Sequence, residues 1–112
     1  MVLSKRAKGR WPEAEPIIMK DAEAAFDYAS DILGERWPEA EPYIKQEPSP
    51  ALFYARDVMK ARWPEAEPTI LKDPEASYMY ALDVIQSRWP EAEPIIMKDP
   101  ESWSKYKKLW KL

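Results

Sequence analysis

The sequence predicts an all-α protein, a short right-handed α-solenoid of four tandem 26-residue helix–turn–helix repeats. The heptapeptide Arg-Trp-Pro-Glu-Ala-Glu-Pro occurs four times without change, and its copies begin 26 residues apart, at Arg10, Arg36, Arg62 and Arg88. A fixed period of this length is typical of repeat arrays. An amphipathic stretch with helical spacing follows the heptapeptide. Because one such unit cannot bury its own apolar face, we expect the units to stack on one another.

The first part of each unit is predicted to be a short helix. An α-helix that began at Pro12 would need the missing amide of Pro16 to bond back to Pro12. The helix should therefore begin no earlier than about Ala14 and end near Lys20, with a 3₁₀ segment as the alternative. Trp11 precedes a proline, which keeps its backbone extended, and we expect its indole to face the core.

The second part of each unit is predicted to be a longer helix. Three units contain an acidic residue followed by Pro, as in Asp73-Pro74, and this pair places a capping side chain before a proline in the first turn. The spacing predicts a helix from Pro74 to about Ser87. One face of this helix carries Ala76, Tyr80, Ala81, Val84 and Ile85.

The period also defines the domain organisation. Residues 1–9 are predicted to be a basic N-terminal arm, and residues 10–112 a single domain with repeats at 10–35, 36–61, 62–87 and 88–112. The fourth repeat has Ser104-Lys105-Tyr106-Lys107 where the first has Phe26-Asp27-Tyr28-Ala29. A terminal repeat needs a polar outer face, so we expect the fourth repeat to be a C-terminal cap.

The composition excludes several kinds of site. The 112 residues include neither Cys nor His, so a thiolate nucleophile, a disulfide framework and the commonest general base and metal ligand are missing. No apolar run approaches the roughly 20 residues of a membrane span, and the first residues lack the apolar core of a secretory signal. We expect a non-enzymatic, cytoplasmic protein with no cofactor and no metal.

Two sets of repeated acids have both a structural and a functional interpretation. Glu13 and Glu15, with their copies, could form carboxylate pairs for catalysis or metal binding. Acids at a helix start also favour its dipole, and the heptapeptide Arg is a ready partner. We favour this structural interpretation because a catalytic pair is not expected four times in one chain. For Asp31, Asp57 and Asp83 we expect pairing with an Arg at a repeat junction, with partner binding as the alternative.

The heptapeptide Trp residues could stack on bases or sugars if their rings were exposed among basic residues. However, residues 11–104 contain all 20 acids and only nine of the 17 bases. We therefore expect the Trp residues to pack in the core.

Basic residues collect at the two ends of the chain. Four of the first ten residues and four of the last eight are Lys or Arg, and neither segment contains an acid. In the C-terminal segment, Trp103, Tyr106 and Trp110 share one helical face, and Leu109 is a further candidate for it. We expect a cap, with a helix that binds a membrane surface, an acidic partner or nucleic acid as the alternative. The opposite charges of array and ends also allow weak self-association.

Positions that differ between repeats are the candidates for binding, since the variable residues of a solenoid lie mostly on its surface. Together with the basic C-terminal segment, they give ten candidate partner-binding residues: Tyr43, Lys45, Gln46, Arg56, Thr69, Leu82, Lys105, Lys108, Trp110 and Lys111.

The phrase Arg-Trp-Pro-Glu-Ala-Glu-Pro-x-Ile, followed by Asp-Pro-Glu and Tyr-Ala-x-Asp-Val, resembles 26-residue helical repeats in uncharacterised proteins of phage and bacterial genomes. The resemblance covers residues 10 to about 100 and implies a repeat architecture but no activity. We expect a protein–protein binding or scaffold module whose partner is another protein. The alternative is a nucleic-acid or anionic-surface binder that uses the basic N- and C-terminal segments.

Overall fold

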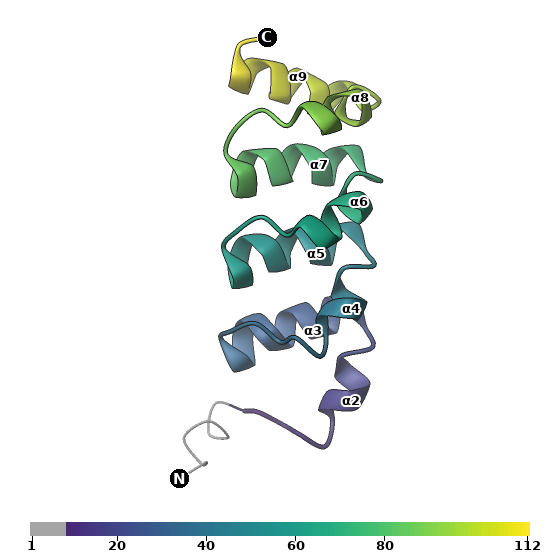
Figure 1. The fold of residues 1–112 in the computed structure, drawn as a ribbon, viewed down its shortest axis with the longest axis vertical. Helices are drawn as coiled ribbons and strands as arrows, with labels where there is room; N and C mark the ends of the chain where they lie inside the picture. The colour runs from purple at the N-terminus through teal and green to yellow at the C-terminus, as the bar shows by residue number, and fades with distance from the viewer. Residues whose placement is uncertain (1–8) are drawn as a thin grey trace.

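The computed structural model describes residues 9–112, and this part of the chain is all-helical, without a strand. Residues 1–8, which make up most of the predicted basic arm 1–9, lie outside the described residues. The molecule is elongated, with extents of 54 × 21 × 21 Å and a Cα radius of gyration of 15.8 Å. In Figure 1 the long helices α3, α5, α7 and α9 follow one another along the longest axis.

Short helices recur at 26-residue intervals directly after the first acid and Ala of each heptapeptide. They are α2 (Glu15–Ile18), α4 (Glu41–Ile44), α6 (Glu67–Ile70) and α8 (Glu93–Ile96). In the third and fourth units a 3₁₀ turn precedes them, η3 (Pro64–Ala66) and η5 (Pro90–Ala92). The second Pro of the heptapeptide falls in the first turn of each helix, where its missing amide breaks no hydrogen bond. The predicted start of the short helix is confirmed to within a residue, but the helix ends two residues before the predicted Lys20, and the 3₁₀ turns precede the α-helix instead of replacing it.

Long helices follow at the same interval. The first three are α3 (Ala22–Tyr28), α5 (Pro48–Tyr54) and α7 (Pro74–Tyr80), which continue as single π-helical turns η1 (Ala29–Leu33), η2 (Ala55–Met59) and η4 (Ala81–Ile85). The fourth, α9 (Pro100–Trp110), is α-helical throughout. The helix predicted from Pro74 to about Ser87 is thus confirmed to within two residues at its end.

A side-chain cap begins three of the four long helices, and a residue in the left-handed conformation follows the end of each. Asp73 accepts a hydrogen bond from the backbone N–H of Ala76 at 2.7 Å, and Asp21 and Asp99 cap their helices in the same way. Glu47, the corresponding residue of the second unit, makes no capping bond. At the other end the backbone turns into the left-handed region, at Gly34 with φ 68° in the first unit and at Lys60, Gln86 and Lys111 in the others.

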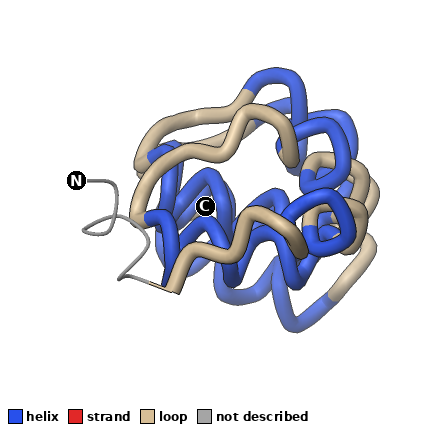
Figure 2. The backbone as a smooth tube through the Cα atoms, turned by 90° about the horizontal axis from the view of Figure 1, so that it is seen from below, coloured by secondary structure: helices blue, strands red, loops and turns tan. Residues whose placement is uncertain are grey.

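The core runs through the length of the molecule between the units. Each of the first three long helices contacts the short and the long helix of the next unit, as α3 does with α4 and α5. Seen along the longest axis in Figure 2, the helices and loops of successive units overlie one another. The buried residues repeat with the period: Trp37, Trp63 and Trp89 are 3% exposed, and Ala40, Ala66, Ala92, Ile44, Ile70, Ile96, Tyr54, Tyr80 and Tyr106 are fully buried.

The predicted burial of the heptapeptide Trp is confirmed in three units and is wrong in the first. Trp11 is 61% exposed, although its sequence neighbours are the same as those of Trp37. The difference arises because Trp37 packs against Tyr28 of the unit before it, and the described residues provide no such helix for Trp11.

Within residues 9–112, no helix combines the length and apolar character required to cross a membrane.

Candidate functional site

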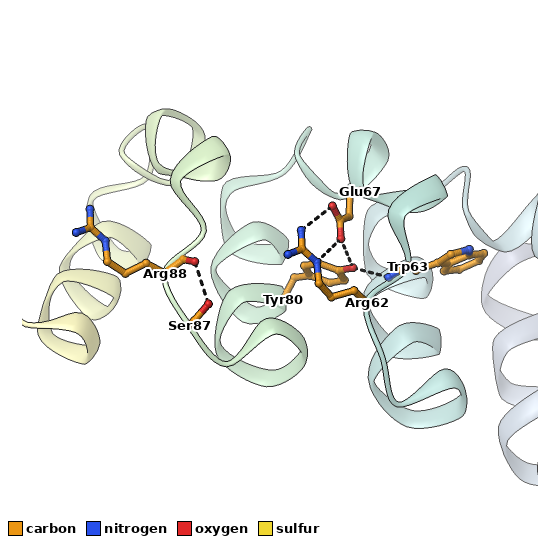
Figure 3. Close-up of polar contacts among 6 residues, drawn as sticks. All are labelled: Arg62, Trp63, Glu67, Tyr80, Ser87 and Arg88. Atoms are coloured by element: carbon orange, nitrogen blue, oxygen red, sulfur yellow. Dashed lines mark hydrogen bonds and ion pairs between the residues drawn. The ribbon is translucent and has the colours of Figure 1, made fainter.

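The invariant polar residues of each unit form one hydrogen-bonded network, shown for the third unit in Figure 3. Arg62 donates to Glu67 from Nε to Oε2 at 2.9 Å and from Nη2 to Oε1 at 3.0 Å. The Tyr80 hydroxyl donates to Glu67 Oε2 at 2.7 Å and accepts from the backbone N–H of Trp63, also at 2.7 Å. One hydroxyl group therefore ties the long helix to the beginning of its own unit.

The same network is present in the other three units. Its members are Arg10, Trp11, Glu15 and Tyr28; Arg36, Trp37, Glu41 and Tyr54; and Arg88, Trp89, Glu93 and Tyr106. The structural interpretation is thus confirmed for the second Glu of the heptapeptide. The first Glu, as in Glu13, is exposed and forms no ion pair with another residue of the span 9–112.

Burial and hydrogen bonding shift the pKa values of the Glu and the Tyr in the network. Burial alone would raise the pKa of Glu67, but the hydrogen bonds from Arg62 and Tyr80 outweigh it, and the pKa lies below its ordinary value of 4.5. Burial, and secondarily the bond to Glu67, raises the pKa of Tyr80 above its ordinary value of 10.0, although the bond from Trp63 acts in the opposite direction. At neutral pH the carboxylate is ionised and the phenol is protonated. These charge states stabilise the network.

The same Tyr residues also join one unit to the next through their rings. Ring centroids of Tyr28 and Trp37 are 5.0 Å apart, and those of Tyr80 and Trp89 are 4.9 Å apart. Such aromatic pairs contribute about 0.5–1.5 kcal/mol beyond the area they bury. The Tyr therefore makes two contacts, one through its hydroxyl with the network of its own unit and one through its ring with the Trp of the next unit. We call these two contacts together a joint.

The fourth unit covers its Tyr from within its own helix. Trp103 stacks on Tyr106 with centroids 5.5 Å apart, and Trp110 meets the same ring edge-on at 6.4 Å. These contacts place three of the four expected aromatic and apolar residues on one face. Leu109, the fourth, is 38% exposed.

The acids of the long helices are only partly paired. Arg56 contacts Asp57 of its own unit at 2.7 Å and Asp83 of the next unit at 3.5 Å. The predicted pairing across a repeat junction is thus confirmed at Asp83. Asp31 is exposed, and no residue of the described part of the chain forms an ion pair with it.

The ten residues selected from the sequence as binding candidates lie on several different surfaces. Tyr43 and Thr69 belong to the short helices, and Lys45 and Gln46 follow the first of these. The remaining six lie on or at the ends of the long helices: Arg56, Leu82, Lys105, Lys108, Trp110 and Lys111. Leu82 and Lys105 line one groove together.

Two grooves occupy equivalent places between neighbouring long helices, 52 residues apart in sequence. The α3–α5 groove has a volume of about 310 Å³ and is lined by Glu23, Phe26, Asp27, Glu47, Ser49, Pro50 and Phe53. The α7–α9 groove has a volume of about 450 Å³ and is lined by Glu75, Tyr78, Met79, Leu82, Asp99, Glu101, Ser102 and Lys105. Each groove combines three acids with aromatic or aliphatic side chains.

Sequence reasoning missed most of the groove residues. Phe26 and Phe53, whose rings are 5.9 Å apart, and Tyr78 and Met79 were assigned no role in binding. A signal was available, because the repeat position of Phe26 holds Phe, Leu, Tyr and Ser in the four units, and the next position holds Asp, Phe, Met and Lys. These positions vary as much as the one that includes Arg56.

Within residues 9–112, no group of three or more acidic side chains is placed to hold a metal ion. Comparison of the chain with protein-family models, with curated proteins and with solved structures gave no match.

Proposed function

We propose that the chain is a short right-handed α-solenoid of four repeats and acts as a non-enzymatic protein-binding module. In this proposal a partner lies across the grooves between neighbouring long helices. The 26-residue recurrence of both helices and the elongated extents of 54 × 21 × 21 Å support the solenoid. Solenoids present extended surfaces, which they commonly use for binding.

The observation that carries the proposal is a division between invariant and variable residues. The invariant Arg, Tyr and second heptapeptide Glu are hydrogen-bonded to one another and, through the Tyr hydroxyl, to the Trp backbone N–H, whereas the first heptapeptide Glu is exposed. Two of the positions that differ in all four units, those of Phe26 and Phe53, line the grooves between the long helices. The fold does not require one particular residue at a position that differs between units. Such positions lie side by side in the grooves.

The α3–α5 groove indicates the chemistry of the partner segment. Phe26 and Phe53 supply apolar area, and Glu23, Asp27 and Glu47 supply negative charge without a basic residue among the lining. A peptide with one or two apolar side chains flanked by Lys or Arg matches both features. Surface charges of this kind contribute more to specificity and association rate than to affinity.

A peptide-display selection against the full chain tests this function. Enriched peptides are then measured against Asp27→Lys, which reverses a charge in the α3–α5 groove, and Glu39→Lys, which makes the same change on an exposed heptapeptide residue. We expect basic, apolar-containing peptides whose affinity falls about ten-fold or more with Asp27→Lys and is unchanged with Glu39→Lys.

Two results would contradict this function. One is a set of peptides that bind both variants equally. The other is a chain that selects no peptide but binds DNA or heparin in a salt-dependent way that is lost when Lys105 and Lys108 are changed to Gln. That second result would support the nucleic-acid or anionic-surface alternative.

A further inference from the structure

The N-terminal end of the array carries an exposed copy of a surface that is largely buried at the three internal joints. We name the side chains of Trp11, Ala14, Ile17 and Ile18 the Trp11 face. We propose that the Trp11 face is a docking site for another chain that ends in an uncapped repeat of this type, whose long helix presents a Tyr ring flanked by small residues. This site is separate from the long-helix grooves and does not depend on what they bind.

Exposure distinguishes this face from its internal equivalents. Trp11 is 61% exposed, whereas Trp37, Trp63 and Trp89 are each 3% exposed. Ala14 and Ile18 are half-buried, whereas their equivalents in all three later units are fully buried. Ile17 is 75% exposed. These residues form an apolar patch with the composition of a joint, and no helix among residues 9–112 covers it.

The Trp11 face is held in the same arrangement as the internal ones. The Trp11 backbone N–H donates to the Tyr28 hydroxyl at 2.6 Å, as Trp37 does to Tyr54 at 2.7 Å. The turn that follows is also the same, with the N–H of Ala14 bonded to the carbonyl of Trp11 at 3.0 Å. A partner would therefore meet a face that is already ordered, and preorganisation of this kind lowers the entropic cost of binding.

The internal joints show what covers such a face. Trp37 packs on the ring of Tyr28 at a centroid distance of 5.0 Å, and the flanking Ala25 and Ala29 are fully buried. The second and third joints repeat this arrangement with Tyr54 and Tyr80. The complementary surface is thus a helix with a small residue three positions before Tyr and Ala directly after it. Because the same joint occurs three times in the chain, it shows which kind of surface would cover the Trp11 face.

The fourth unit of this chain does not offer that surface. Trp103 stands at the repeat position of Ala25 and Lys107 at that of Ala29. The ring of Tyr106 is already covered by Trp103 and Trp110. A bulky indole and a charged amine therefore occupy the positions where the internal joints have small, buried residues. The unmodified chain can accept a repeat at its Trp11 face but cannot donate one, so unmodified copies are not expected to form chains with each other.

A donor–acceptor pair tests the proposal with full-length protein. The acceptor is the unmodified chain. The donor carries Trp103→Ala, Lys107→Ala and Trp110→Val, which restore the pattern of the second unit, together with Trp11→Glu, which blocks its own face. Sedimentation analysis of the mixture should show a one-to-one complex and no larger species. The dissociation constant should rise about ten-fold or more when the acceptor also carries Trp11→Glu, and it should stay unchanged when the acceptor carries Lys98→Glu.

A second donor covers the case in which the first does not fold, as judged by its helical circular dichroism. In that donor, residues 100–112 are replaced by the sequence of residues 74–86, which is native to the third unit and in register, again with Trp11→Glu. A folded donor that forms no complex would overturn the proposal, as would a complex insensitive to Trp11→Glu in the acceptor. Failure of both donors to fold would also count against it, because the uncapped end would then not exist as a stable surface.

Discussion

The joint is tested most sharply by removing a single oxygen atom with Tyr80→Phe. The change keeps the aromatic ring, which packs against Trp89 at 4.9 Å. It removes the hydroxyl that donates to Glu67 and accepts from the Trp63 N–H, both at 2.7 Å. A buried N–H without a partner costs about 1–3 kcal/mol, and a hydrogen bond to a charged group contributes about 1.5–3 kcal/mol.

We expect the free energy of unfolding to fall by about 2–4 kcal/mol, since the Glu67 carboxylate can recover part of its loss from water. This is a large fraction of the ~5–15 kcal/mol that stabilises a typical domain. Urea denaturation followed by circular dichroism measures it as a lower midpoint with an unchanged slope.

Tyr78→Phe is the matched control on the same helix. Tyr78 is half-buried, and within the described residues its hydroxyl makes no hydrogen bond with another side chain or the backbone. Its replacement should leave the midpoint nearly unchanged. If Tyr80→Phe shifted the midpoint no more than Tyr78→Phe does, the hydroxyl would not hold the joint together and the reasoning would be refuted.

Further substitutions probe other parts of the same account. Trp63→Ala should cost about 3–5 kcal/mol and Trp11→Ala, at an exposed site, less than about 1 kcal/mol; equal shifts in melting temperature would contradict this. The folded-state pKa of Glu67 lies below its ordinary value of 4.5, so its stabilising effect is present above pH 4.5 and is lost as pH falls through the folded value. Glu67→Gln should therefore give a shallower acid limb in stability measured against pH, and an unchanged limb would argue against the ion pair. Asp73→Ala should cost about 0.5–2 kcal/mol through its cap, whereas Glu47→Ala, which removes no cap, should cost almost nothing in the same denaturation assay.

The helices could be predicted from the sequence because their signals are local. The second Pro of the heptapeptide, as in Pro68, fixes where the short helix can begin, and Asp73-Pro74 marks the start of the long one. The Arg–Glu pair was also accessible, since Arg62 and Glu67 lie five residues apart in one invariant phrase. The left-handed ends at Lys60 and Gln86 were not predictable, because neither residue type favours that conformation.

The joint itself could not be derived from the sequence. Tyr80 was visible as an invariant residue, but its partners Glu67 and Trp63 are 13 and 17 residues away, and only the packed structure places them beside its hydroxyl. The exposure of Trp11 could not be read from the heptapeptide either. Its local sequence is identical to that of the buried Trp37, and the difference comes entirely from the neighbouring unit.

The central claim is that the units are stacked end to end through identical joints, and small-angle X-ray scattering of the full chain tests it most directly. A compact domain of this length has a radius of gyration of about 13 Å, whereas the stacked arrangement has a Cα value of 15.8 Å and a longest extent of 54 Å. We predict a radius of gyration near 16 Å and the asymmetric pair-distance distribution of a rod. A symmetric distribution with a radius near 13 Å would contradict the stacked arrangement.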